Sequence, residues 1–369
     1  MAGEQRGRVS IIIPTYNRVG MVIEAVQSAL DQTYPDVEVI VVDDGSTDGT
    51  GERLRTTFGD RIRYLYQDNA GRSRARNRGI AAATGEAFIF LDSDDWLLPT
   101  AVADGMAFLQ THPDVDVAYG DGYYTDARGR RLSRLSDERP PVSPHRLLEV
   151  MVLHNLPIAP HAAIVRRRAL DRLQGPPWFD ETLRGAEDAD FWLRLAAAGA
   201  SFAEHSAPVC LYRLHDENAS SPRHPLWNRR WRSMQRFKCK TYRADFFATL
   251  PLATRVEFIR QLLVIFFAGE PEAQEALMAE PPFRALPAES QAELLRRVGL
   301  ETLLQGDVRT GRRWLERACA LCGRPRYCWT ARMALGGGLL LRFFVPLYRR
   351  LRGWHEVDWE ARRRGRVEG

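Results

Sequence analysis

Short hydrophobic runs alternate with helical patterns over the first 120 residues of the chain. Five runs are rich in β-branched and aromatic side chains and predict strands, at residues 9–13, 37–42, 62–66, 87–91 and 115–119. Between them, hydrophobic positions recur with helical spacing at residues 19–30, 48–57 and 74–83, and a further helix is expected after Pro99. This alternation predicts an α/β domain with a mostly parallel sheet and helices on both faces.

The pattern changes further along the chain. The Arg-, Ser- and Pro-rich stretch 126–144 predicts a loop, and the elements expected after it are a strand at 161–165, a helix at 189–198 and strands at 201–203 and 209–214. Beyond residue 220 helical patterns dominate, including a helical hairpin made by residues 294–304 and 311–321. We therefore expect three parts: an α/β domain over 1–220, a helical region over 221–333 and a basic amphipathic tail over 334–369.

Composition narrows the class of protein. Hydrophobic residues make up 45% and charged residues 27% of the 369 residues, which excludes a disordered, collagen-like or disulfide-knotted chain. The apolar runs are much shorter than the roughly 20 residues of a membrane-spanning helix. The run 9–13 is followed at once by Pro14 and lacks the features of a secretory signal. We expect a cytoplasmic protein whose five cysteines are reduced, with the pair Cys319 and Cys322 packed as core thiols.

Acidic and polar side chains follow three of the predicted strands. Pro14-Thr15-Tyr16-Asn17 follows the first strand, a loop containing Asp43 and Asp44 follows the second, and Asp92, Asp94 and Asp95 follow the fourth. In a parallel sheet these loops meet at the carboxyl edge, where ligands bind. Three carboxylates within four residues repel one another unless a cation is present, and hard oxygen ligands suit Mg²⁺ or Mn²⁺.

Helix caps are the simpler explanation for each loop taken alone, since Asp, Ser and Thr commonly precede helices. Two acidic loops at one sheet edge make that explanation insufficient. No Gly-x-Gly-x-x-Gly sequence follows the first strand and the chain has no Walker loop, so a dinucleotide or P-loop site is not supported.

Several of these segments together resemble the family 2 glycosyltransferases. The resemblance covers roughly residues 8–220, and its segments occur in the family's order. They are Val9-Ser10-Ile11-Ile12-Ile13-Pro14-Thr15-Tyr16-Asn17-Arg18, Val41-Val42-Asp43-Asp44-Gly45-Ser46-Thr47-Asp48, Ala75-Arg76-Asn77-Arg78-Gly79, Leu91-Asp92-Ser93-Asp94-Asp95, Ala186-Glu187-Asp188-Ala189-Asp190 and Tyr212-Arg213-Leu214-His215. The resemblance implies a GT-A fold, an activated nucleotide sugar as donor, UDP-linked by preference, and inversion at the anomeric carbon.

The resemblance also implies roles for individual residues. The nucleotide is expected at Pro14, Thr15, Tyr16, Asn17, Asp44, Arg72, Arg76 and Asp94. A Mn²⁺ or Mg²⁺ ion is expected at Asp92, Asp94 and Asp95, with His215 either a further ligand or a structural histidine.

Asp188 is expected to be the general base that takes the proton of the acceptor hydroxyl. The alternative for Glu187 and Asp188 is a first-turn interaction with a helix dipole. Glu187, His154 and Trp178 are candidates for the acceptor side, and His161 is a weaker one that could equally serve packing.

The positive charge is concentrated after residue 220, where 28 Lys and Arg accompany 15 Asp and Glu. Residues 324–354 contain seven arginines, no acidic residue and much apolar bulk, which suits a segment lying on an anionic membrane surface. A docked helix with exposed arginines is the alternative, and no nucleic-acid motif accompanies the charge. We expect a glycan or lipid-linked glycan as acceptor. The rival functions are a sugar nucleotidyltransferase and a non-catalytic glycan-assembly scaffold.

Overall fold

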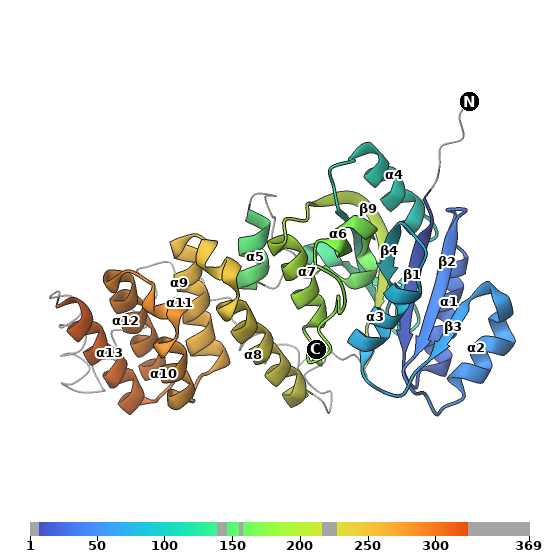
Figure 1. The fold of residues 1–369 in the computed structure, drawn as a ribbon. Helices are drawn as coiled ribbons and strands as arrows, with labels where there is room; N and C mark the ends of the chain where they lie inside the picture. The colour runs from blue at the N-terminus through green and yellow to red at the C-terminus, as the bar shows by residue number, and fades with distance from the viewer. Residues whose placement is uncertain (1–6, 139–145, 155–157, 216–226, 324–369) are drawn as a thin grey trace. The chain divides into compact units, whose positions relative to one another are not determined.

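The computed structural model describes residues 7–138, 146–154, 158–215 and 227–323 (Figure 1). The basic tail therefore lies outside the described residues. Contacts within the chain divide it into two compact units, Met1–Phe237 and Lys238–Gly369. The sequence placed this boundary after residue 220. The structure places it within helix α8 (Trp227–Arg243), because Ser233 on that helix bonds to the turn at Gly185 in the first unit.

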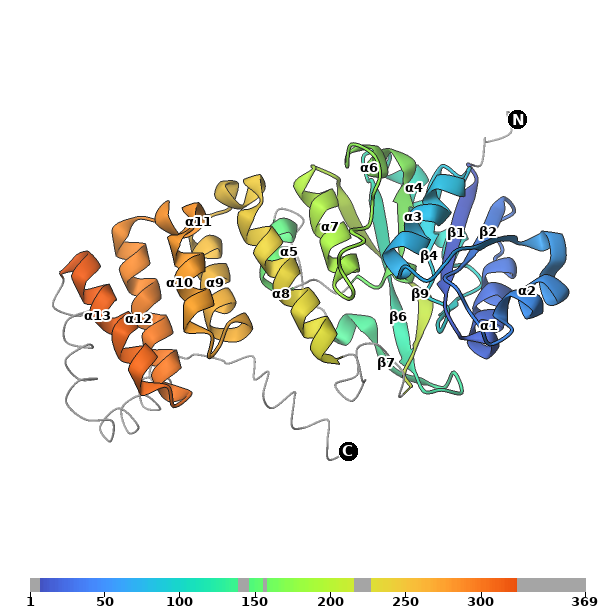
Figure 2. The same ribbon diagram turned by 60° about the horizontal axis from the view of Figure 1, so that its bottom comes forward.

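The first unit is built on one mixed sheet, whose path runs β3-β2-β1-β4-β8-β6-β9-β5 (Figures 1 and 2). Its first four strands run parallel, as the sequence predicts: β1 (Val9–Thr15), β2 (Val37–Asp43), β3 (Arg63–Tyr66) and β4 (Ala87–Phe90). The other strands are β5 (Trp96–Leu97), β6 (Val117–Thr125), β7 (Arg131–Arg134), β8 (Ala163–Arg166) and β9 (Phe202–Arg213). Strand β8 lies antiparallel to β4 and to β6, so the sheet changes direction there.

Helices cover both faces of this sheet (Figure 2). One face packs against α1 (Val19–Leu30), α2 (Thr50–Phe58) and α4 (Ala101–Thr111), with Ile11 and Ile13 of β1 in the shared core. The other face lies toward α3 (Arg72–Ala82), where a Cβ atom on Gly79 would come within 2.4 Å of Ile12. Glycine is therefore required for α3 to approach β1 this closely. The unit also contains α5 (Leu147–His154), α6 (Arg167–Asp171), α7 (Glu187–Ala197) and the short 3₁₀ turns Gly59–Arg61, Leu135–Glu138 and Pro160–Ala162.

The sequence prediction misplaced several connections. The stretch predicted as a loop contains β7, whose four residues are exposed and pair with the edge of β6. The two predicted final strands are one continuous strand, β9, although its middle is polar and contains Pro208. The long parallel pairing with β6, which has register shifts near Asp121, carries β9 through this polar middle. Hydrophobic pattern alone could not detect these two segments as strands, because β7 is exposed and pairs only with β6, and β9 keeps its polar middle in the sheet by pairing with β6 on one side and β5 on the other.

The second unit is helical, as expected. After α8 it contains α9 (Leu252–Gln261), α10 (Pro271–Ala279), α11 (Pro281–Arg284), α12 (Ala288–Leu304) and α13 (Val308–Cys322), with a 3₁₀ turn at Asp245–Thr249 and a short π-helix at Leu262–Phe266. Helices α12 and α13 form the predicted hairpin, and Asp307 caps α13 by accepting a hydrogen bond of 3.0 Å from the Thr310 N–H.

Two findings concern the helices and the cysteines. Within the described ranges, no helix combines the length and the apolar character needed to cross a membrane. Cys210, Cys239 and Cys322 are free, whereas Cys319 is disulfide-bonded. The expectation of reduced thiols is therefore wrong at Cys319.

Candidate active site

The ends of β1 and β2 form a polar cradle at the carboxyl edge of the sheet. Asp44 is buried, and its carboxylate accepts hydrogen bonds of 2.7 Å from Gln67 Nε2 and 2.8 Å from the Gly71 N–H. The Asp44 N–H donates to the Thr15 carbonyl oxygen at 2.8 Å, which places the two residues side by side. The Thr15 hydroxyl is buried and has no hydrogen-bond partner among the described residues. Because buried hydroxyls are normally paired, this one suits a ligand.

The other residues predicted for the nucleotide lie around this cradle. Pro14 is buried within β1, beside Val42 of β2. Tyr16 and Asn17 are exposed at the end of the strand, and Tyr16 presents 47% of its surface. Asn17 has a positive φ of 49°, and its side-chain oxygen accepts a hydrogen bond from the Thr47 N–H at 2.8 Å. The loops after β1 and β2 are thus bonded to each other.

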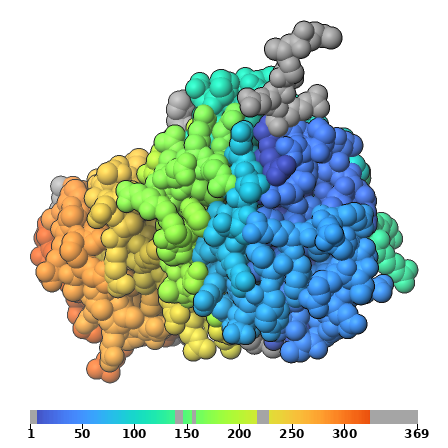
Figure 3. Space-filling view, turned by 45° about the vertical axis from the view of Figure 1, so that its right-hand side comes forward, coloured from blue at the N-terminus to red at the C-terminus, as the bar shows by residue number. Residues whose placement is uncertain are grey.

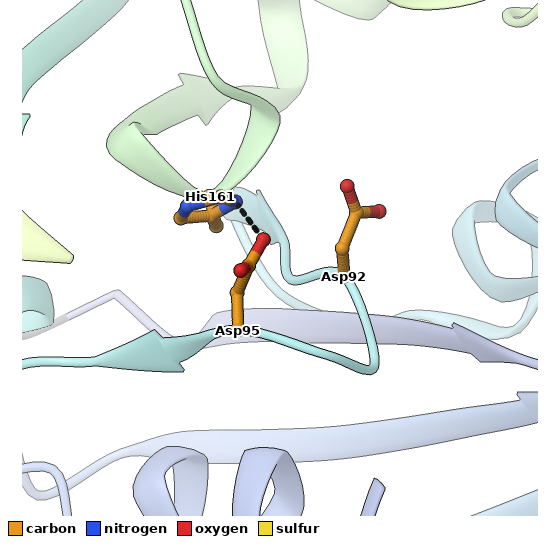
Figure 4. A group of neighbouring side chains, drawn as sticks. All are labelled: Asp92, Asp95 and His161. Atoms are coloured by element: carbon orange, nitrogen blue, oxygen red, sulfur yellow. Dashed lines mark ion pairs between the residues drawn. The ribbon is translucent and has the colours of Figure 1, made fainter. Parts of the chain in front are cut away.

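Three side chains that could hold a metal ion lie close together, two from the loop after β4 and one from the turn before β8. Carboxylate oxygens of Asp92 and Asp95 and a ring nitrogen of His161 lie within 4.8 Å of one another. Figure 4 shows both carboxylates rising from one loop, with the imidazole reaching them from the turn before β8. His161 Nδ1 lies 3.5 Å from an Asp95 oxygen, and in the part of the chain that the structure describes neither ring nitrogen has a hydrogen-bond partner.

The pKa shifts of Asp95 and His161 favour the binding of a cation by this group. Burial raises the pKa of Asp95 well above its ordinary value, and the charges of Asp94 and Asp92 raise it further. Burial also lowers the pKa of His161, which favours the neutral imidazole that binds metals. A divalent cation would stabilise the ionised carboxylate in place of a proton. Carboxylate oxygens suit Mg²⁺ or Mn²⁺, whereas an imidazole ligand favours a transition-metal ion over Mg²⁺.

Asp94 and His215 form a second cluster, separate from Asp92, Asp95 and His161. His215 Nε2 lies 3.1 Å from an Asp94 oxygen, and the Arg18 guanidinium forms an ion pair with the same oxygen. Burial by itself would raise the pKa of Asp94, but the hydrogen bond to His215 and the charge of Arg18 hold it well below its usual range. Asp94 is therefore a carboxylate at neutral pH, turned toward two basic groups.

Arg76 joins the aspartate loop to the segment that contains the predicted base. Its side chain is 1% exposed and donates to Asp92 at 2.6 Å and to Glu187 at 3.2 Å. The guanidinium also lies 5.2 Å from the ring centre of Phe179. Both sequence segments therefore meet at one buried cation. In the space-filling view, the surface of α3 lies beside the green segment that leads into α7 (Figure 3).

Asp188 lies in the first turn of α7, after Ala186 in the left-handed conformation with φ of 68°. Burial raises the pKa of Asp188 above its ordinary value, and the neighbouring charge of Glu187 adds to this effect. Burial alone would also raise the pKa of Glu187, but Arg72 and then Arg76 lower it. The pair thus consists of a firmly ionised Glu187 and a more basic Asp188, the property that a general base needs.

The remaining predicted residues lie at varying places. The Arg72 guanidinium is 43% exposed and lies 3.3 Å from the Glu187 carboxylate. Trp178 is half-buried, and its carbonyl oxygen accepts a hydrogen bond from Arg194 on α7. His154 is exposed at the end of α5, and α5 packs against α7.

Sequence reasoning missed two residues of this site. His161 was assigned only to a weak acceptor-side role, because a lone histidine in an apolar stretch carries no ligand spacing. Arg18 was part of the first loop motif but was given no role. In neither case does local sequence indicate the aspartate that the side chain meets, because the pairing arises from sheet order.

Comparison with known proteins identifies the family. Residues 10–174 match the model of the family described as Glycosyl transferase family 2. The chain is 32% identical over 220 residues to an uncharacterized glycosyltransferase of Rickettsia typhi, covering 58% of this chain and 66% of that protein. It is 33% identical over 215 residues to a chondroitin synthase of Escherichia coli, covering 58% of this chain and 30% of the synthase.

A solved structure has the same fold. The structure of S. aureus TarS 1–349 in complex with UDP-GlcNAc aligns with a TM-score of 0.54 and 20% identity, covering 85% of this chain and 88% of that one.

The chain spans about a third to two thirds of the length of the curated relatives named above. The sheet, the order of the motifs and the sequence matches agree: the chain belongs to glycosyltransferase family 2 and has the GT-A fold.

Proposed function

We propose that this glycosyltransferase moves a sugar from a nucleoside-diphosphate sugar, with a UDP-sugar favoured, to a hydroxyl of a glycan or lipid-linked glycan. The observation that carries the proposal is the position of buried Arg76 between Asp92 and Glu187. It supports a donor site and a base segment that adjoin each other, as direct transfer requires. Relatives named chondroitin synthase and hyaluronan synthase support a polysaccharide product, such as a bacterial surface glycan.

The donor would lie along the carboxyl edge of the sheet. The Thr15 hydroxyl, which no described residue bonds, and the turn ordered by Asp44 are suited to the nucleotide, with Tyr16 exposed beside them. Asp92, Asp95 and His161 would hold the divalent cation. When bound, such a cation neutralises charge on the diphosphate and makes it a better leaving group.

Transfer would proceed as a single displacement with inversion. The acceptor oxygen attacks the anomeric carbon, its proton passes to the Asp188 carboxylate, and the bond to the nucleoside diphosphate breaks. The raised pKa of Asp188 strengthens it as a base, while Glu187 stays ionised beside Arg72 and Arg76. Replacing Asp188 by Asn should lower transfer by about 10²- to 10⁴-fold, since this is the usual contribution of a general base.

The experiment measures nucleotide binding and transfer separately. Thermal stability is recorded with UDP, GDP, dTDP or CDP, each with and without Mn²⁺, on wild type and Asp95→Ala. Ligand at 100 times its dissociation constant stabilises by about 2.7 kcal/mol, which a thermal shift detects. We expect one nucleotide to stabilise the wild type with metal and the Asp95→Ala protein to lose that effect.

The control is Asp60→Asn, which changes an exposed carboxylate in the turn before β3. It should keep both nucleotide binding and transfer. A wild type that none of the nucleotides stabilises would favour a non-catalytic scaffold, and a wild-type rate of transfer in Asp188→Asn would remove that residue from the role of base.

A further inference from the structure

A cavity of about 640 Å³ opens beside the base segment, in the first unit, and arginines line it. Arg229, Arg232 and Arg236 come from α8, and Arg184 comes from the turn before α7. Positions three and seven residues after Arg229 fall on the same side of a helix, so the three helical arginines form one stripe. All four side chains are exposed to solvent.

The cavity is built into the structure rather than formed by chance between surface side chains. Ser233 of α8 is 3% exposed, and its hydroxyl accepts from the Arg184 N–H at 3.0 Å and donates to the Gly185 carbonyl oxygen at 2.5 Å. The side chain of Arg230 lies against Gly185 from the same helix. These contacts fix the stripe next to the turn that leads directly into Glu187 and Asp188.

Among the described residues, nothing compensates the charges in the cavity. None of Arg184, Arg229, Arg232 and Arg236 forms an ion pair in the described part of the chain, and no described carboxylate lines the cavity. Four like charges around one space repel one another and produce a positive potential that favours an anion. Arginine side chains bind phosphate through paired hydrogen bonds, so phosphate is the best match for such a cluster.

The position of the cavity indicates which substrate brings the phosphate. The Arg184 guanidinium lies over Gly71, where a Cβ atom would be 2.3 Å from it, and Gly71 belongs to the turn that Asp44 holds. The cavity therefore adjoins both the nucleotide cradle and the base segment, while its lining residues belong to neither. We propose that it binds a phosphate group of the acceptor. This inference rests on the proposed function, because it assumes that an acceptor is aligned beside Asp188.

Inorganic pyrophosphate, titrated calorimetrically into the full chain without metal, is the test ligand. The cavity variant is Arg232→Gln/Arg236→Gln. The control is Arg309→Gln/Arg317→Gln, which removes the same charge from exposed positions on α13. Because charge-assisted hydrogen bonds are among the stronger hydrogen bonds, the loss of two arginines should lower the affinity for pyrophosphate at least about tenfold. The control should stay within about twofold, because diffuse surface charge is screened by salt.

Stabilisation by UDP with Mn²⁺ is measured on all three proteins and should be the same in each. Equal pyrophosphate affinity in the wild type and the cavity variant would overturn the proposal, as would equal losses in both variants. If no nucleotide stabilises any of the proteins, the proposed transfer fails and the acceptor assignment fails with it. A selective loss of pyrophosphate binding would then identify an anion site of another use.

Two further probes separate the sources of the phosphate. One is phosphatidylcholine vesicles that contain a polyprenyl phosphate, and the other is a water-soluble glycerol phosphate oligomer. Selective loss of vesicle binding in the cavity variant supports a lipid-linked acceptor. Selective loss of oligomer binding supports a phosphodiester within the glycan. Unchanged binding of both probes would overturn the acceptor assignment.

Discussion

Replacing Arg76 by methionine removes a buried cation that two carboxylates share. The Arg76 side chain is 1% exposed and that of Glu187 is 3% exposed, so the variant leaves the buried Glu187 carboxylate with fewer positive charges beside it. Breaking a buried ion pair by removing one partner costs about 3–5 kcal/mol. Glu187 keeps Arg72 at 3.3 Å and the Gly185 N–H at 3.0 Å, so we expect about 3 kcal/mol, the lower end of that range.

Thermal unfolding of the first unit measures this loss. For domains of 150–250 residues, 1 kcal/mol shifts Tm by about 2–4 °C, so the expected decrease is roughly 6–12 °C. The matched control is Arg74→Met, which removes an exposed arginine from the same helix. A second variant, Arg76→Met/Glu187→Gln, also removes the more deeply buried of the two carboxylates and should recover part of the lost stability, because the carboxylate that remains, Asp92, is 24% exposed.

The pH dependence gives an independent check. Burial by itself would raise the pKa of Glu187, but Arg72 and Arg76 lower it. A carboxyl with a lowered pKa stabilises the fold above its unfolded pKa of about 4.3, and this stabilisation is lost as pH falls through the folded pKa. The difference between wild type and Arg76→Met should therefore be full at pH 7 and narrow below about pH 4. Equal Tm values for Arg76→Met and Arg74→Met at pH 7 would refute the reasoning.

Four further measurements follow from the site and the helical unit. Glu187→Gln removes a charge that raises the pKa of Asp188, so the acid limb of the kcat/KM profile should move to lower pH; an unmoved limb would show that Asp188 does not set it. His161→Ala should lower the affinity for Mn²⁺ about tenfold or more, measured as the Mn²⁺ concentration needed for stabilisation by UDP, while an unchanged affinity would exclude the imidazole as a ligand. Burial lowers the pKa of Lys238 to about 7, so between about pH 7 and 10 the unfolded chain binds more protons and the free energy of unfolding should rise with pH. In denaturant unfolding, Lys238→Met should be more stable than the wild type at pH 7 and should show no such rise. The same pH dependence in both proteins would contradict this. Truncation before residue 324 should reduce sedimentation with anionic vesicles but not with neutral ones, and unchanged sedimentation would argue against a membrane role for the tail.

Much of the site could be derived from local sequence. The β-branched run in β1 and the spacing of α1 follow from patterns that extend over a few residues, and both elements occur where they were predicted. The acidic loop after β4 was identifiable because Asp92 and Asp95 are neighbours in the chain and follow a buried strand. The loops after β1, β2 and β4 lie at one edge of the sheet because these strands run parallel.

Only the tertiary structure decides which distant side chains meet. Arg76 and Glu187 are 111 residues apart, and His161 reaches Asp95 from the turn that leads into β8. The contact of His161 depends on the position of β8, which inserts antiparallel between β4 and β6, and no local periodicity records that position. The separation of the acidic loop into two groups has the same origin, since Asp94 pairs with Arg18 and His215 from other strand ends. Residue spacing along the chain therefore determined which chemical groups are present, and strand order determined their partners.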